Sequence, residues 1–275
     1  MSIKDVISAY INSSVNKKNT SFTKLVGKAI LAGMMIGMGA AGSSVAAHAV
    51  SNVGLARLVA GVVFPVGLMM VIILGAELFT GDCLVAMAVP EKKVSLLQYI
   101  RILISVYLGN LLGGTLLSLM VYYSGQFNYS NGLLGAYTIK VAVGKVGLDF
   151  DTAIVSGILC NILVCVAVLM AGCAKDVTGK LLVAFFVIML FVVSGFEHCV
   201  ANMYYITAGL LAKMNPDYVA VAMKQYELSQ VQIDSLNLFG YYVKNLLPVT
   251  LGNIMGGTLF LGLPLYYLNR DKKAN

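Results

Sequence analysis

Six apolar segments dominate the sequence and limit the folds that are open to it. Each is close to the ~20 residues that an α-helix needs to cross the hydrocarbon core of a bilayer. They cover residues 24–50, 55–89, 100–123, 152–174, 181–211 and 241–268. The chain is 59% hydrophobic and only 11% charged, whereas about a quarter of a soluble domain is charged. We therefore expect an all-α integral membrane protein with six transmembrane helices.

The basic residues are distributed unevenly between the loops of this topology. With a cytoplasmic N-terminus, most of the 19 Lys and Arg residues lie on the cytoplasmic side. The outside set is limited to Arg57, Lys140, Lys145, Lys213, Lys224 and Lys244. Such a bias orients membrane proteins, so we expect a multi-pass protein of the cell inner (plasma) membrane with both termini in the cytoplasm. The net charge of +7 is then a topology signal and does not indicate nucleic-acid binding.

An internal repeat indicates how the six helices are organised. Residues 108–116 read LGNLLGGTL and residues 251–259 read LGNIMGGTL. In the span before each string, a glycine is followed two residues later by a glutamate, at 75–77 and at 195–197. Because three spans per half is an odd number, the halves have opposite orientations in the membrane. The pattern predicts a 3+3 inverted repeat with two broken helices, whose breaks mark the substrate site.

This organisation divides the chain into five parts. We expect an N-terminal amphipathic segment, a first three-helix repeat, an extracellular loop, a second three-helix repeat and a cytoplasmic tail. Their bounds are 1–23, 24–124, 125–151, 152–268 and 269–275.

The fifth apolar segment carries a Glu-His pair at its centre. Glu197 and His198 follow Gly195 inside a run long enough to span the bilayer. Ionisable side chains at that depth are costly unless they face protein or a water-filled cavity. Unwound backbone there is tolerated only where it lines a cavity or is buried in protein. The pattern favours one half of a permeation pathway; the alternative is a buried structural histidine hydrogen-bonded to the backbone.

The residues at the breaks resemble the formate/nitrite transporter family. The matching pieces are Glu77-Leu78-Phe79-Thr80-Gly81, Gly195-Phe196-Glu197-His198 with Ala201-Asn202-Met203, Asn161, and Gly252-Asn253. The resemblance implies an aquaporin-like protomer, a homopentamer with one pore in each protomer, and conduction of small monovalent anions such as formate, nitrite and hydrosulfide. Gly81-Asp82 after Leu-Phe-Thr is similar to the hydrosulfide channel branch.

The resemblance also implies roles along the pore. It assigns Thr80 to a gating loop, Phe64 and Leu78 to a hydrophobic constriction on the cytoplasmic side, and Phe191 to the outer constriction. An anion loses hydration at such apolar narrows, which is costly without compensation.

Polar residues are implied between and outside these constrictions. His198, Asn161 and Asn253 fall in the central pore, and Lys145 falls in the outer vestibule. Imidazole has an unperturbed pKa of ~6.5, so His198 is expected to hydrogen-bond the anion or to protonate it. Lys145 is expected to attract anions, with an ordinary solvated loop lysine as the alternative.

Three carboxylates are interpreted as structural. Glu77 and Glu197 hold equivalent places in the repeat, and free carboxylates in a pore would repel anions. We expect them to bond free backbone N–H groups or the partner repeat. Asp82 is expected to cap the second half of the broken span.

The sequence also bears on three other functional classes. A proton-coupled anion carrier of the same fold stays open. An aquaporin-like neutral-solute channel would carry paired Asn-Pro-Ala turns, but Asn-Pro occurs only at 215–216, in an outside loop. A metalloenzyme built on His198 and cysteines is disfavoured because zinc sites take three or four protein ligands. We expect a transport protein, not an enzyme, with no cofactor or metal, whose partners are anions, copies of itself and the bilayer.

Overall fold

The computed structural model describes residues 1–270, and all regular structure in this range is helical. In chain order the elements are α1 (Ile3–Asn19), α2 (Phe22–Ala47), α3 (Val53–Val63), α4 (Val66–Leu74), α5 (Phe79–Asp82), η1 (Cys83–Ala88), α6 (Leu96–Tyr123), η2 (Gln126–Asn128), α7 (Leu133–Val146), α8 (Phe150–Cys173), α9 (Val177–Ser194), α10 (Cys199–Ala212), α11 (Pro216–Tyr226), α12 (Gln230–Ser235), η3 (Gly240–Leu246), α13 (Leu247–Met255), η4 (Gly256–Gly262) and α14 (Leu263–Asn269).

Within residues 1–270, six helical stretches are long and apolar enough to cross a membrane, which confirms the predicted number of spans. They are Phe22–Ala47, Val53–Leu74, Leu96–Tyr123, Phe150–Cys173, Val177–Ser194 and Gly240–Asn269. Two shorter apolar helices, Phe79–Ala88 and Cys199–Ala212, follow the second and fifth stretches. These are the second halves of the two broken segments.

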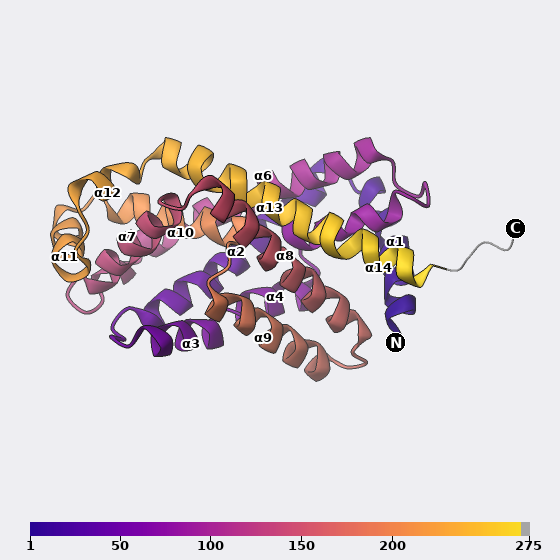
Figure 1. Ribbon diagram of the computed structural model, residues 1–275, viewed down its shortest axis with the longest axis horizontal. Helices are drawn as coiled ribbons and strands as arrows, with labels where there is room; N and C mark the ends of the chain where they lie inside the picture. Colours follow the sequence, from indigo (N-terminus) through magenta and orange to yellow (C-terminus); the bar gives the residue numbers. More distant parts are fainter. Residues whose placement is uncertain (271–275) are drawn as a thin grey trace, which may run out of the picture.

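The spans lie roughly along the long axis of the molecule (Figure 1). The N-terminal helix α1 and the end of α14 lie at one end of the bundle, on the right of the figure, and α7, α11 and α12 lie at the other. We call these the α1 end and the α7 end. The two ends of the described chain therefore lie on the same side of the spans, as an even number of crossings requires.

The segment 125–151, predicted as a loop, contains a helix of 14 residues, α7. Its buried side chains Leu134, Ile139 and Val143 pack toward the bundle, and α7 contacts α10 and α11. The turn residues that suggested a loop occupy only its start, up to Gly132. Of the predicted tail, residues 271–275 lie outside the described range.

Left-handed glycines create both breaks. Gly75 ends α4 with φ +64°, and Gly195 ends α9 with φ +74°. A side chain disfavours this conformation, which is why glycine is the usual residue at such a helix end. In each case the next helix begins four residues later, so the two predicted interruptions have the same local geometry.

One asparagine from each repeated string closes each break. The Oδ1 of Asn110 accepts from the backbone N–H of Phe79 at 2.9 Å, and the Oδ1 of Asn253 accepts from that of Cys199 at 2.9 Å. In both cases the Nδ2 donates to the carbonyl two residues earlier. These bonds satisfy backbone groups that a buried helix end would otherwise leave without partners. The repeat seen in the sequence is thus a repeat of structure.

Small residues let the last span of each repeat approach the first. A Cβ on Gly113 of α6 would collide with the carbonyl of Ile30 on α2. A Cβ on Gly256, at the same place in the second string, would collide with the carbonyl of Ile158 on α8. Close crossings of this kind are how helices associate in a bilayer.

Candidate functional site

Each break borders a cavity of about 250 Å³. The α7-end cavity is lined by residues that include Arg57, Phe64, Lys145, Phe191, Glu197 and His198. The α1-end cavity is lined by residues that include Lys17, Leu68, Val71, Leu78, Asp82 and Lys180. The structure therefore brings most of the predicted site residues to two cavities at opposite ends of one bundle.

Apolar side chains close the inner ends of both cavities. Phe64 and Phe191 meet edge to face in the α7-end cavity, with ring centroids 5.5 Å apart and an interplanar angle of 84°. Leu78 lines the α1-end cavity and is 4% exposed. Phe64 was expected on the same side as Leu78; it lies instead with Phe191, because α3 ends on the α7 side of the break.

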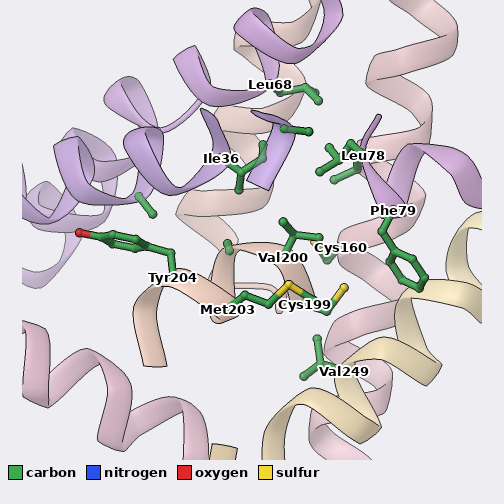
Figure 2. Close-up of a cluster of buried hydrophobic side chains, with 14 of the residues drawn as sticks. Ile36, Leu68, Leu78, Phe79, Cys160, Cys199, Val200, Met203, Tyr204 and Val249 are labelled. Carbon is green, nitrogen blue, oxygen red and sulfur yellow. The ribbon is translucent and has the colours of Figure 1, made fainter. Parts of the chain in front are cut away.

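Buried apolar side chains also fill the region between the breaks (Figure 2). Leu78 from the first break and Val200 from the second lie in this cluster together with Ile36 and Leu68. Val200 is fully buried. These side chains therefore form an apolar barrier between the two breaks.

The polar contact across this barrier joins the two breaks directly. Thr80 Oγ1 and His198 Nε2 are 3.0 Å apart, and both residues are buried. His198 Nδ1 accepts a hydrogen bond from the backbone N–H of Ala201 at 3.0 Å and so caps α10. Because Nδ1 is an acceptor, a neutral ring carries its hydrogen on Nε2 and donates it to Thr80. The hydroxyl hydrogen of Thr80 is then left to donate to another group.

Asn161 and Asn253, expected in the central pore, lie behind the breaks. Both are fully buried, and neither is among the residues that line the two cavities. Asn161 Nδ2 donates to the carbonyls of Thr80, at 3.1 Å, and of Asn253, at 2.6 Å. In this structure their contacts hold the unwound backbone in place.

At the α7 end, a lysine neutralises the buried glutamate. Lys145 Nζ lies 2.9 Å from Glu197 Oε1, and the two side chains are 15% and 7% exposed. Asn202 Nδ2 donates to the other carboxylate oxygen at 2.6 Å and to Asn245 Oδ1 at 2.8 Å. One positive and one negative charge therefore balance within an amide network.

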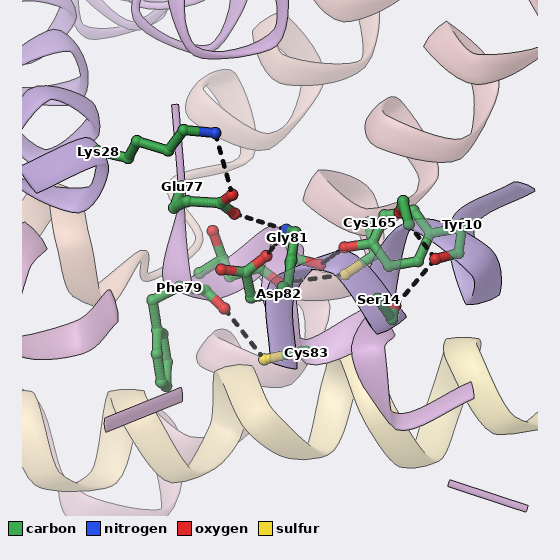
Figure 3. A network of polar contacts seen from close by, with 12 residues as sticks. Tyr10, Ser14, Lys28, Glu77, Phe79, Gly81, Asp82, Cys83 and Cys165 are labelled. Carbon is green, nitrogen blue, oxygen red and sulfur yellow. Dashed lines mark hydrogen bonds and ion pairs between the residues drawn. The ribbon is translucent and has the colours of Figure 1, made fainter. Parts of the chain in front are cut away.

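At the α1 end, one lysine contacts two carboxylates. Lys17 Nζ on α1 lies 2.6 Å from Glu77 Oε2 and also pairs with Asp82. Figure 3 shows Glu77 and Asp82 in one network with Lys28, which lies 3.8 Å from Glu77. Burial alone would lower the pKa of Lys17, but Asp82, Tyr10 and Glu77 together raise it well above its usual value. This lysine is therefore firmly protonated.

Two of the structural assignments of the carboxylates need revision. Asp82 makes no capping bond, since α5 begins after Leu78 and Asp82 is its last residue. Glu77 and Glu197 were expected to bond free backbone N–H groups or the partner repeat; their contacts within residues 1–270 are with lysine and asparagine side chains. Lysines brought from other helices are better partners for a buried carboxylate than neutral amides.

No role was predicted for Asn110, Asn202 or Lys17, and Asp82 was predicted only as a helix cap, although the repeat relates each of them to a residue in the other half. Asn110 stands in the first repeated string where Asn253 stands in the second. Asp82 and Asn202 each follow the break glutamate by five residues. Lys17 precedes the start of α2 by five residues, just as Lys145 precedes the start of α8.

Comparison with known sequences places these features in a wider group. Residues 4–267 match the formate/nitrite transporter family. The chain is 42% identical over 219 residues to the formate channel FocA of Haemophilus influenzae, covering 79% of this chain and 76% of that protein. It is 32% identical over 273 residues to the formate-nitrite transporter of Plasmodium falciparum, covering 94% and 82% of the two chains.

Solved structures show the same fold. A pentameric formate channel with formate bound superposes with a TM-score of 0.81 at 34% identity, covering 90% of this chain and 97% of that one. An ion channel of the FNT family superposes with a TM-score of 0.82 at 28% identity, covering 96% and 98%.

Proposed function

This chain belongs to the formate/nitrite transporter family, and from that premise we propose that each protomer conducts small monovalent anions, formate among them, between its two cavities. The family consists of channels and transporters and not of enzymes. The observation that carries the proposal is the Thr80–His198 hydrogen bond, which joins both breaks at the barrier between the cavities.

The barrier supplies hydrogen-bond donors where an anion has lost its water. Phe64 and Phe191 form the constriction at the α7 end, and Leu78 forms the one at the α1 end. Desolvation of an anion is costly unless donors replace the water. The hydroxyl of Thr80 and the Nε2–H of His198 are the donors between these constrictions, and movement of the Thr80 loop opens the path.

His198 acts as a neutral donor in this mechanism. A second proton on the ring would occupy Nδ1, whose lone pair accepts the N–H of Ala201 and caps α10. Protonation would therefore break the cap as well as charge a buried ring. This argues against His198 as the proton source and for an anion channel over a proton-coupled carrier, although both share this fold.

The same premise extends to substrate, assembly and location. We propose formate as the main substrate because FocA relatives and a solved pentameric channel are named for it. Nitrite and hydrosulfide are further substrates of the same charge and small size. We propose a homopentamer in the plasma membrane, with the α1 end, Lys17 and both termini in the cytoplasm and Lys145 in the outer vestibule.

Flux measurements test this proposal. Purified protein in liposomes is supplied with formate, nitrite, hydrosulfide or chloride over a pH series, with proton movement recorded in parallel. We expect formate flux that does not require stoichiometric proton flux and that His198→Phe abolishes, because the neutral donor at the barrier is lost. Unchanged formate flux in His198→Phe would remove the histidine from the mechanism, and obligatory one-to-one proton movement would favour the carrier.

A further inference from the structure

A third cavity, of about 500 Å³, adjoins the α7-end cavity. We call the place where the two cavities share lining residues the neck. The third cavity is lined by residues that include His48, Lys140 and Tyr226. The residues that line both cavities are Arg57, Ala60, Tyr137 and Val192. Of these four, Arg57 and Tyr137 are the polar ones. A solute that moves from the third cavity toward His198 passes these two side chains.

The cationic side chains around this neck differ in whether groups of the protein already pair with them. Lys145 lies 2.9 Å from Glu197, so its charge is balanced inside the protein. Lys140 lies over the rings of Tyr137 and Tyr226, at 5.4 and 5.1 Å from their centroids.

Arg57 is exposed, and within residues 1–270 its one hydrogen bond is a long contact of 3.4 Å from Nη1 to the carbonyl of Val193. A guanidinium has five N–H donors. Most of the donors of Arg57 are therefore available to a ligand, with a full charge that no carboxylate of the described chain balances.

The second break makes room for this guanidinium. A Cβ on Gly195 would lie 3.0 Å from Arg57 Nη1. The left-handed glycine that ends α9 therefore also allows the arginine to lie over the break, above Glu197 and His198. The position of Arg57 is tied to the architecture of the pathway and is not that of a free surface side chain.

We propose that Arg57 and Tyr137 form a carboxylate-binding site at the neck, which captures a planar two-oxygen anion before it reaches the Phe64–Phe191 constriction. This inference rests on the proposed function and names the group that selects the substrate. A guanidinium fork matches two coplanar oxygens and forms paired charge-assisted hydrogen bonds. Formate and nitrite have this shape, whereas hydrosulfide has a single acceptor atom.

Tyr137 supplies a neutral donor beside the charge. Burial raises the pKa of Tyr137, so its hydroxyl keeps its proton at physiological pH and can donate to an anion oxygen. The predicted vestibule lysine, Lys145, then has a separate task. It keeps Glu197 neutralised so that the anion meets no net negative charge below the neck.

Equilibrium exchange of labelled formate tests the site, because exchange has no direction and does not depend on how the protein is oriented in the liposomes. Arg57→Gln is compared with Lys244→Gln, which removes one exposed charge at the same end of the bundle without lining either cavity. Arg57→Lys keeps the charge and removes the fork. Tyr137→Phe removes one donor.

We expect Arg57→Gln to lower exchange at low formate about tenfold and to leave saturating exchange nearly unchanged, since a cation at a mouth raises local anion concentration. Arg57→Lys is expected to lower exchange about threefold, because one point charge replaces paired bonds. Tyr137→Phe is expected to lower exchange about twofold, the effect of one neutral hydrogen bond. Lys244→Gln is expected to match the unmodified protein.

Three results would overturn the inference. Equal exchange in Arg57→Gln and Lys244→Gln would remove Arg57 from the pathway. If Arg57→Lys exchanges formate as fast as the unmodified protein, the positive charge alone is sufficient and the paired guanidinium hydrogen bonds are not required. Absence of formate exchange in the unmodified protein would instead remove the proposed function, and this site with it.

Discussion

The two helix breaks share a backbone scaffold but differ in how many charged residues they hold. Each has a left-handed glycine, a glutamate two residues later and a closing asparagine from the last span of its repeat. Each also takes a lysine from the helix that precedes its repeat, Lys17 on α1 or Lys145 on α7. The structural repeat is therefore longer than three spans, because it includes the helix before them.

Two residues distinguish the charges at the breaks, because the first break also has Lys28, 3.8 Å from Glu77. Five residues after the glutamate, the second break has Asn202 and the first has Asp82. Lys145 thus faces one carboxylate, whereas Lys17 faces two. The backbone geometry of the breaks is therefore preserved between the repeats, while their charges differ in number: two lysines and two carboxylates at the first break, one of each at the second.

Removal of Lys145 tests the balanced pair and carries the largest expected effect. Lys145→Ala leaves Glu197 buried without its cation, and breaking such a pair costs about 3–5 kcal/mol. Thermal or denaturant unfolding of the purified protein measures this loss. Lys145→Ala combined with Glu197→Gln is expected to recover most of it, because no unpaired charge remains. Equal stability of Lys145→Ala and the unmodified protein would contradict the pairing.

Removal of Lys17 tests the larger cluster at the first break and is expected to cost less stability. Lys17→Ala loses charged hydrogen bonds, about 2 kcal/mol, and the loosened α1 admits water to Glu77 and Asp82. Faster proteolysis within α1 is expected, with the rest of the chain still protected. Asp82→Asn is the matched variant, since it leaves Lys17 with one carboxylate partner, as Lys145 has at the α7 end; it is expected to keep α1 protected. Rapid cleavage of α1 in Asp82→Asn would break the analogy between the ends.

Substitution of the two break glycines is expected to lower stability equally but to affect formate exchange differently. Gly75→Ala and Gly195→Ala are each expected to lose about 1–2 kcal/mol, the cost of a left-handed non-glycine residue. Gly75 has open space around the position of a Cβ, whereas Gly195 has Arg57 beside it. Gly195→Ala alone is therefore expected to slow formate exchange at low concentration. Equal exchange in the two variants would indicate that Arg57 does not depend on the break.

The pH dependence of α1 gives the smallest expected effect. The raised pKa of Lys17 means that its stabilising contribution is present below the unfolded value of ~10.4 and is lost only as pH rises through the higher folded value. A spin label at Ala9→Cys, with the partly exposed Cys173 changed to Ser, is expected to keep constant mobility from about pH 7 to 10. Release of the label within that window would show that Lys17 does not hold α1.

Much of the fold followed from local patterns. The six spans, both interruptions and the repeat were predicted from apolar length, glycine position and two matching strings, and the structure contains each of them. A bilayer requires every backbone N–H and C=O to be satisfied within the protein. Helices of fixed length are then obligatory, and their interruptions are visible in the residue order.

Neighbours across the bundle were decided by the tertiary structure. In the structure Phe64 contacts Phe191, and a helix, α7, lies where a loop was expected. Asn161 and Asn253 are fully buried against the break backbone and do not line the cavities. The tertiary structure also brought Lys17 to Glu77 and Arg57 to the neck above Gly195. Such contacts depend on how each helix is rotated and where it folds back, and these depend on packing between residues far apart in the chain.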